Sequence, residues 1–139
     1  MRIAPGLLDE IIAHARDEYD AECCGLIAYR DLAPDGNGRA LEVRRAENKW
    51  ASRKRFEIDG RELLRTINEF EDSGWELGAI YHSHTHTAPY PSQTDINFAS
   101  GWPGLEWVIV GLAGDHPEVR CYLIEEARVQ EVELEVDAT

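Results

Sequence analysis

Two histidines separated by one residue, His82 and His84, are the first candidates for chemistry in this chain of 139 residues. They follow an apolar, partly β-branched and aromatic stretch, residues 75–81, which predicts a β-strand that ends at the histidines. Side chains two positions apart on a strand point to the same face, so we expect the two imidazoles side by side. Imidazole is a common zinc ligand, and the pair therefore indicates a metal site, although such a pair can also be structural.

Asp95 is the candidate for a third ligand, because a catalytic zinc site usually takes three protein ligands and leaves the fourth position to water. It follows His84 by eleven residues, and the loop between them contains Pro89 and Pro91 and can fold back to the strand end. Two histidines and one aspartate would leave zinc cationic enough to lower the pKa of its water to about 7. His86 continues the every-second-residue spacing of His82 and His84. Since Asp95 already supplies the third ligand, we expect His86 at the pocket rim or exposed to solvent.

Ser92 and Asp95 also match a capping box, in which a serine caps a helix and an acidic residue three positions later bonds back to it. A serine in this position can begin the helix and still face a metal. The two uses are therefore compatible, and the sequence does not separate them.

Glu22 is a candidate proton carrier. Amide hydrolysis at zinc calls for a carboxylate that takes a proton from the attacking water and later gives one to the leaving amine. Glu22 comes directly before an apolar stretch, residues 23–29, that could lie beside the strand of the histidines. Spacing alone does not select it from the other carboxylates.

The whole pattern resembles the JAMM (MPN+) motif of zinc metallopeptidases, an upstream glutamate followed by H-[S/T]-H-x7-S-x2-D. Every position of that motif is filled, by Glu22, His82, Ser83, His84, Ser92 and Asp95.

The resemblance implies a role for each of these residues. His82, His84 and Asp95 would bind Zn²⁺, and Glu22 would act as general base and acid. Ser92 would donate a hydrogen bond to the oxyanion, a contribution on the order of 3 kcal/mol. Many members carry proline directly after the second histidine, where this chain has Thr85, a departure that removes no ligand.

The amino-acid sequence around the motif is most similar to that of the bacterial Mec-type members. Those members release cysteine or another adduct from the C-terminal glycine of a small ubiquitin-like sulfur carrier protein, so the resemblance implies hydrolysis of an amide or isopeptide bond there. The chain has no room for the insertions with which deubiquitinating members grip a ubiquitin pair. A zinc hydrolase of small-molecule amides and a non-catalytic MPN scaffold remain as alternatives.

Hydrophobic periodicity predicts the elements that must position these residues. We expect helices over 7–19, with Asp9 and Glu10 in the first turn, over 61–72 and, briefly, over 96–99. Strands are expected over 23–29 and 39–46, joined as a hairpin by the turn at 34–38, and over 75–82, 105–112, 119–124 and 128–136, the last with a bulge at 130–131. The fold class is α/β or α+β: a single MPN/JAMM-type domain over 1–139, with a mixed β-sheet flanked by helices in a cytidine-deaminase-like architecture.

The composition argues against several partners and compartments. A net charge of −13, from 27 acidic and 14 basic residues, repels nucleic acid and anionic membranes. The chain lacks an apolar run of about 20 residues and a secretory signal, so we expect a cytoplasmic protein. Three cysteines without C-x-x-C spacing favour packing over a disulfide framework or thiolate zinc site. Six of the basic residues gather in residues 44–55, as a solvated face or as a docking patch for an acidic partner.

Overall fold

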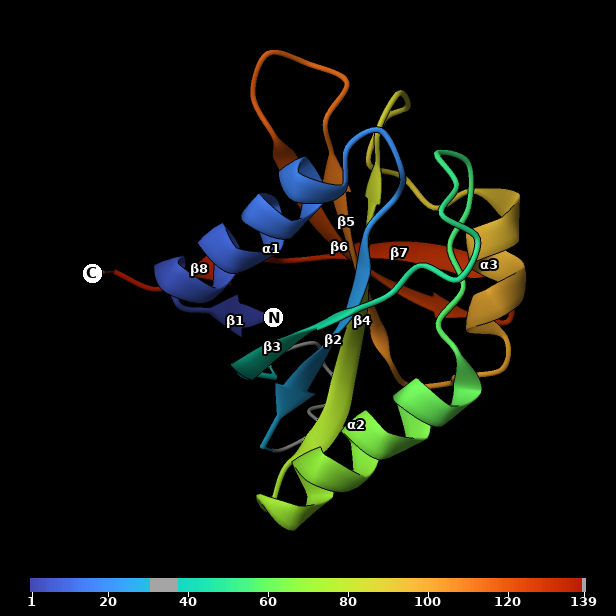
Figure 1. Ribbon diagram of the computed structural model, residues 1–139. Helices are drawn as coiled ribbons and strands as arrows, with labels where there is room; N and C mark the ends of the chain where they lie inside the picture. The colour runs from blue at the N-terminus through green and yellow to red at the C-terminus, as the bar shows by residue number, and fades with distance from the viewer. Residues whose placement is uncertain (31–37, 139) are drawn as a thin grey trace.

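The computed structural model describes residues 1–30 and 38–138, and within them a mixed sheet of six strands forms the centre (Figure 1). Its spatial order is β3-β2-β4-β5-β6-β7. The strands are β2 (Cys24–Tyr29), β3 (Ala40–Ala46), β4 (Glu76–His84), β5 (Glu106–Gly111), β6 (Glu118–Glu125) and β7 (Arg128–Val132). Strands β4 and β5 run parallel to each other, and the remaining neighbours pair antiparallel.

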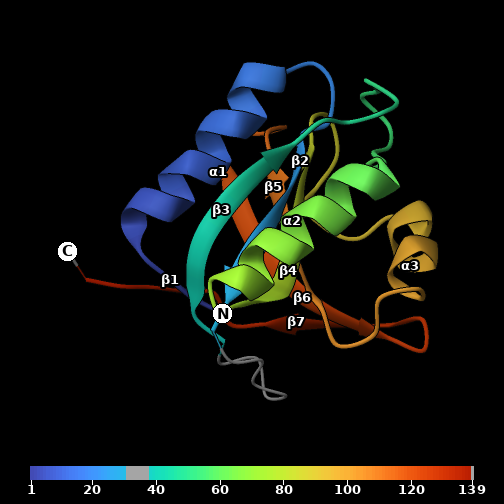
Figure 2. The ribbon, with the colours of Figure 1, turned by 60° about the horizontal axis from the view of Figure 1, so that its bottom comes forward.

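Helices cover both faces of this sheet (Figures 1 and 2). Helix α1 (Pro5–Glu18) packs on one face, whereas α2 (Gly60–Asp72) and α3 (Gln93–Ala99) pack on the other. Strand β2 shows the result, because all six of its residues are buried and successive side chains join opposite cores. Leu26 packs with the α2 and α3 side, and Ile27 packs with the α1 side. The expected mixed sheet flanked by helices is confirmed.

Both ends of the described chain differ from the sequence expectation. The strand expected over 128–136 is wrong, since β7 ends at Val132 and pairs with β6 without a register shift, so the bulge is absent. The chain then forms β8 (Glu135–Val136), which pairs in parallel with β1 (Arg2–Ile3), a strand that was not predicted. Strands of two residues carry too little alternation to be recognised before their partner is known.

The helix starts also lie earlier than expected. Helix α1 begins at Pro5, because proline fits the first helical position, where its missing N–H needs no partner. Its first turn therefore contains no acidic residue, and the placement of Asp9 and Glu10 there is wrong. Helix α3 begins at Gln93 rather than at residue 96. The turn expected at 34–38 lies, apart from Gly38, outside the described residues.

No helix in the described ranges is both long enough and apolar enough to cross a bilayer.

Candidate metal centre

The two histidines lie on one face at the end of β4. His82 and His84 are 0% and 5% exposed, and their Nε2 atoms are 3.2 Å apart. The Nδ1 nitrogen of His84 lies 2.9 Å from the Ala88 carbonyl oxygen, which fixes the ring with its proton on Nδ1 and leaves Nε2 free as a ligand atom. The ring of His82 stacks on Phe56, with centroids 4.4 Å apart. The predicted pair of adjacent imidazoles is confirmed.

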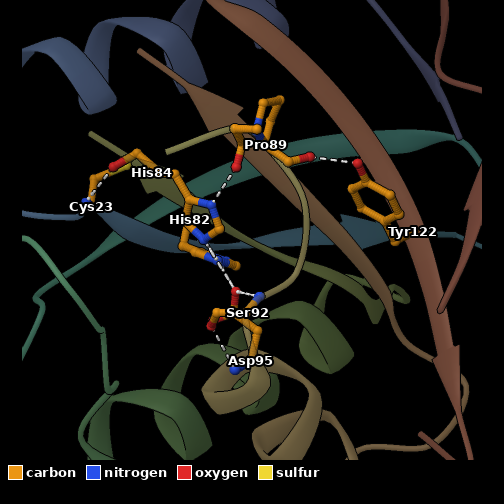
Figure 3. A network of polar contacts seen from close by, with 9 residues as sticks. Cys23, His82, His84, Pro89, Ser92, Asp95 and Tyr122 are labelled. Atoms are coloured by element: carbon orange, nitrogen blue, oxygen red, sulfur yellow. Dashed lines mark hydrogen bonds and ion pairs between the residues drawn. The ribbon is translucent and has the colours of Figure 1, made fainter. Parts of the chain in front are cut away.

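Asp95 completes a triangle of donor atoms with the two imidazoles. Its Oδ2 lies 3.1 Å from Nε2 of His82 and 3.2 Å from Nε2 of His84. Figure 3 shows these side chains converging from β4 and from the start of α3. Ligands bound about 2.0–2.1 Å from a tetrahedral zinc ion stand roughly 3.3 Å apart, so the spacing and the nitrogen and oxygen donors fit Zn²⁺.

A capping box holds Asp95 in place. The Asp95 N–H donates to Ser92 Oγ at 3.1 Å, and the Ser92 N–H donates to Asp95 Oδ2 at 2.9 Å. The oxygen that faces the imidazoles is therefore also the oxygen that caps α3. Ser92 itself is exposed, and after accepting one hydrogen bond its hydroxyl still has a proton to donate.

Strand pairing brings Glu22 to the same place. Strand β2 runs antiparallel to β4 with Cys24 opposite His82, so the residues before β2 lie at the end of β4 that carries the histidines. Glu22 is 4% exposed, and its carboxylate forms with the two imidazoles a group whose donor atoms lie within 4.8 Å of one another, a group able to hold a metal. No ion pair within 4.0 Å joins it to either histidine in the described part of the chain.

Gly25 allows this close pairing. It faces Tyr81 across the two strands, and a Cβ atom at Gly25 would stand 2.2 Å from the Tyr81 ring. Tyr81 in turn reaches α1, where its hydroxyl lies 2.6 Å from His14 Nδ1. The Cys-Cys-Gly segment after Glu22 is thus explained by packing.

Burial disposes Glu22 to carry a proton. Loss of solvent raises the pKa of Glu22 to about 7, with His84 opposing the shift and Asp95 adding to it. Its Oε1 is buried and has no hydrogen-bond partner among the described residues. A carboxyl group with its pKa near neutrality can both accept and release a proton at physiological pH.

The same surroundings move the other three groups in different directions. Burial works to raise the pKa of Asp95, but His82, His84 and the Ser92 N–H outweigh it and hold that pKa far below its usual range. Burial lowers the pKa of His82. It also works to lower the pKa of His84, but there Asp95 and the Ala88 carbonyl prevail and raise it. Asp95 thus stays ionised and His82 stays neutral, the forms in which both bind metals.

His86 lies apart from this group. It is exposed, and its Nε2 lies 2.7 Å from Asp20 Oδ1. Arg53 approaches the same Asp20 carboxylate at 3.7 Å. Three loops, before β2, after β4 and around residue 53, therefore meet at Asp20 on the surface.

Two hydrogen bonds that tie the Glu22 segment to its surroundings were not predicted from the sequence. Ser83, between the histidines, accepts the Cys23 N–H at 2.8 Å and so joins the Glu22 segment to β4. Asn48 donates from Nδ2 to the Glu22 carbonyl oxygen at 3.0 Å. Nothing in the local sequence marks Asn48, since its partners are up to 26 positions away.

Comparisons with known proteins agree with this architecture. Residues 4–125 match the model of a family described as prokaryotic homologues of the JAB domain. The CysO-cysteine peptidase of Mycobacterium tuberculosis is 33% identical over 135 residues, which cover 96% of this chain and 89% of that protein. The desampylase of Pyrococcus furiosus is 31% identical over 116 residues, 84% of this chain and 76% of that protein.

A solved structure shares the fold closely. The solution structure of a protein from Desulfitobacterium hafniense superposes with a TM-score of 0.87 at 30% identity, covering 99% of this chain and 93% of that one. The family match spans the elements that carry Glu22, the two histidines and Asp95. The chain therefore belongs to the family of prokaryotic JAB-domain homologues, the JAMM group that the motif had indicated.

Proposed function

We propose that this protein is a zinc-dependent peptidase of the JAMM type, which hydrolyses the amide or isopeptide bond after the C-terminal glycine of a ubiquitin-like or sulfur carrier protein. The observation that carries the proposal is the convergence of Asp95 Oδ2 with the two imidazole Nε2 atoms, with the Glu22 carboxylate beside them. The relatives named as a CysO-cysteine peptidase and a desampylase support the substrate class.

His82, His84 and Asp95 are the proposed ligands. Asp95 is preferred to Glu22 as the third ligand because its Oδ2 lies within 3.2 Å of both Nε2 atoms. Zn²⁺ held there would supply a Lewis acid for the scissile carbonyl and make a water molecule acidic enough to attack at neutral pH.

Glu22 is the proposed general base and acid. Its carboxylate lies within 4.8 Å of the imidazole nitrogens without pairing to them, a separation that leaves room for one water between. It takes the proton of the attacking water and delivers a proton to the departing amine nitrogen. A pKa raised to about 7 suits both transfers.

Ser92 is the proposed oxyanion donor. Its Oγ accepts from the Asp95 N–H, so its own proton points elsewhere and is available to the carbonyl oxygen as negative charge develops there.

The loop of residues 48–57 is the proposed docking site of the carrier protein. An extended glycine-rich tail would bind along residues 50–58 through main-chain hydrogen bonds. Four of the six cations of the 44–55 cluster already pair within the chain: Arg44 with Glu42 and Glu69, Arg45 with Asp17, Lys49 with Glu57, and Arg53 with Asp20. Docking of an acidic partner therefore falls to Lys54 and Arg55, together with Arg53, whose pair with Asp20 is the longest of the four. Arg55 lies over the exposed Trp50 ring at 4.0 Å.

We further propose that residues 1–139 act as one domain and that the protein works in the cytoplasm. All three cysteines are free and buried, which suits a reducing compartment.

A substrate panel with and without chelator tests the proposal. Purified protein is incubated with a ubiquitin-like carrier bearing a C-terminal Gly–Cys amide, with a carrier extended by a longer peptide, and with small acyl amides. We expect cleavage after the carrier glycine, loss of cleavage in chelator, and recovery on adding Zn²⁺. Cleavage of small amides alone would favour the small-molecule hydrolase, and a zinc-loaded protein that cleaves nothing would favour a non-catalytic scaffold.

A further inference from the structure

Asn48 forms hydrogen bonds with both of its amide atoms. Its Nδ2 donates to the carbonyl oxygens of Glu22 and Arg55, each at 3.0 Å, and lies 3.5 Å from that of Ser52. Its Oδ1 accepts from the N–H of Trp50 at 3.1 Å and of Glu57 at 3.2 Å. Carbonyl oxygens face only Nδ2 and N–H groups face only Oδ1, so the orientation of the amide is fixed by its partners.

The loop around Asn48 also binds the main-chain N–H of Glu22. The Glu22 N–H donates to the Ser52 carbonyl oxygen at 2.7 Å. Both main-chain polar groups of Glu22 therefore bond to the segment that Asn48 organises, and not to a neighbouring strand. Glu22 and Asn48 also line one cavity of about 390 Å³.

The pairing of β2 with β4 does not itself hold the main chain at residue 22. Strand β2 begins at Cys24, so Glu22 precedes the first ladder pair of β2 and β4. Its side chain must nevertheless stay within 4.8 Å of two imidazoles that are fixed on β4. Without the Asn48 contacts, the Glu22 carbonyl oxygen would lose its partner and the segment that holds the Glu22 N–H would lose its own support. The main chain at Glu22 would then be held mainly one residue later, through Cys23 and Ser83, and the carboxylate would move more freely.

We propose that Asn48 is a positioning residue for the reaction: by tying the 48–57 loop to the Glu22 main chain, it holds the Glu22 carboxylate in line with the metal centre. This inference rests on the proposed function only in assigning proton transfer to Glu22; the structural tie is independent of it. Misplacing a reacting group by about 1 Å can cost 10²-fold in rate.

Two substitutions separate the contacts. Asn48→Asp keeps an oxygen for the Trp50 and Glu57 N–H groups but sets a second oxygen against the Glu22 and Arg55 carbonyls, which repel it. Asn48→Ala removes all of these bonds. Asn68→Asp, an identical chemical change at an exposed position of α2, is the matched control.

The experiment measures kcat and KM on the carrier Gly–Cys amide, zinc content, and the exchange of single backbone amides by NMR. For both Asn48 variants we expect kcat to fall about 10- to 100-fold with zinc unchanged, and any rise in KM from the loosened 48–57 loop to come in addition to that fall. The Glu22 N–H, bonded to Ser52, should exchange at least about tenfold faster, while the Cys23 N–H, bonded to Ser83, keeps its protection. The Asn68→Asp control should match the wild type throughout.

The outcomes distinguish the two proposals. Wild-type kcat or wild-type exchange at Glu22 in both Asn48 variants overturns the positioning role, and so does a loss carried by KM alone, which would indicate docking. If the wild-type protein cleaves no carrier amide, the proposed function fails, while the exchange of the Glu22 N–H still decides whether Asn48 holds that residue.

Discussion

At the scale of single residues, the centre depends on one carboxylate oxygen that has two sets of partners. Oδ2 of Asp95 receives the Ser92 N–H and lies against both imidazoles. The pattern Ser-x-x-Asp could therefore be interpreted from the sequence as a helix cap or as part of a metal site. The capping box is present, and we propose that the same aspartate also binds the metal. Local spacing predicted the cap and the adjacent imidazoles, because each depends on residues within one turn or one strand face. The contact between Asp95 and the histidines depends instead on how the loop between β4 and α3 folds back.

Ser92 offers a test that separates capping from catalysis. Ser92→Gly and Ser92→Ala both remove the hydroxyl donor, so we expect kcat to fall about 10²- to 10³-fold in each. Glycine is tolerated at an N-cap, whereas alanine costs about 1 kcal/mol, so urea unfolding should show the loss of stability mainly in Ser92→Ala. A variant with full kcat would limit Ser92 to capping.

Asn48 shows where residue-level prediction stopped. A single asparagine in a charged loop carries no periodicity and no motif, and its importance comes from a carbonyl 26 positions away. Glu22 is an intermediate case. Its chemistry was foreseeable, but its selection needed a family resemblance, because the spacing of 60 residues to His82 is set only by the pairing of β2 with β4.

At the scale of elements, the antiparallel pairing of β2 with β4 brings Glu22 to the histidines. Gly25 permits this pairing because it leaves room for the Tyr81 ring. Sequence periodicity located these strands well because both are long and buried on two faces. It failed for β1 and β8, which exist only because they pair with each other. The main strands and helices were therefore predictable, and the short closing pair was not.

Gly25→Ala tests the strand contact. The new methyl group would meet the Tyr81 ring at 2.2 Å, and overpacking of this kind costs about 1–3 kcal/mol. We expect urea unfolding to show that loss, together with weaker zinc retention as β2 shifts against β4. Gly6→Ala in α1, where a Cβ meets nothing within 4 Å, is the control and should be neutral or slightly stabilising. Equal stability of the two variants would contradict the account.

Helix α1 should give the fold a pH dependence through His14. Burial lowers the pKa of His14 to about 4, with Arg45 adding to the shift and Asp17 opposing it. Its Nδ1 lies 2.6 Å from the Tyr81 hydroxyl, from which the neutral ring accepts a hydrogen bond. The unfolded chain binds a proton at His14 more readily, so its contribution is present above pH 6.5 and is lost as pH falls toward 4.

The corresponding measurement is the free energy of unfolding at pH 7.5 and pH 5 for the wild type and His14→Gln. The wild type should lose about 2 kcal/mol more than the variant over this range. An identical loss in both proteins would show that His14 does not titrate in this way.

At the scale of the whole molecule, a net charge of −13 contrasts with a local basic loop. Self-repulsion between acidic proteins disfavours encounter, so an acidic carrier would approach through the few cations that are not neutralised within the chain. Of the original cluster of six, Lys54 and Arg55 form no ion pair among the described residues, and Arg53 forms only the 3.7 Å pair with Asp20.

Replacing Arg53, Lys54 and Arg55 together by glutamine should raise KM for the carrier substrate about tenfold at low salt, and the difference should shrink as salt rises. The value of kcat should stay unchanged. The control replaces Arg2, Arg65 and Arg128, three exposed cations outside the loop, and changes net charge equally. An unchanged KM in the loop variant, or an equal rise in the control, would reject the docking role.

The central claim is that two carboxylates beside one pair of histidines have different roles: Asp95 binds the zinc ion, and Glu22 transfers protons. Zinc content and carrier hydrolysis, measured together on the wild type, Glu22→Gln and Asp95→Asn, test it most directly. We predict about one zinc per chain in the wild type and in Glu22→Gln, with hydrolysis only in the wild type, and loss of both zinc and hydrolysis in Asp95→Asn. A wild type without zinc, or a Glu22→Gln variant that loses zinc while Asp95→Asn keeps it, would contradict the account.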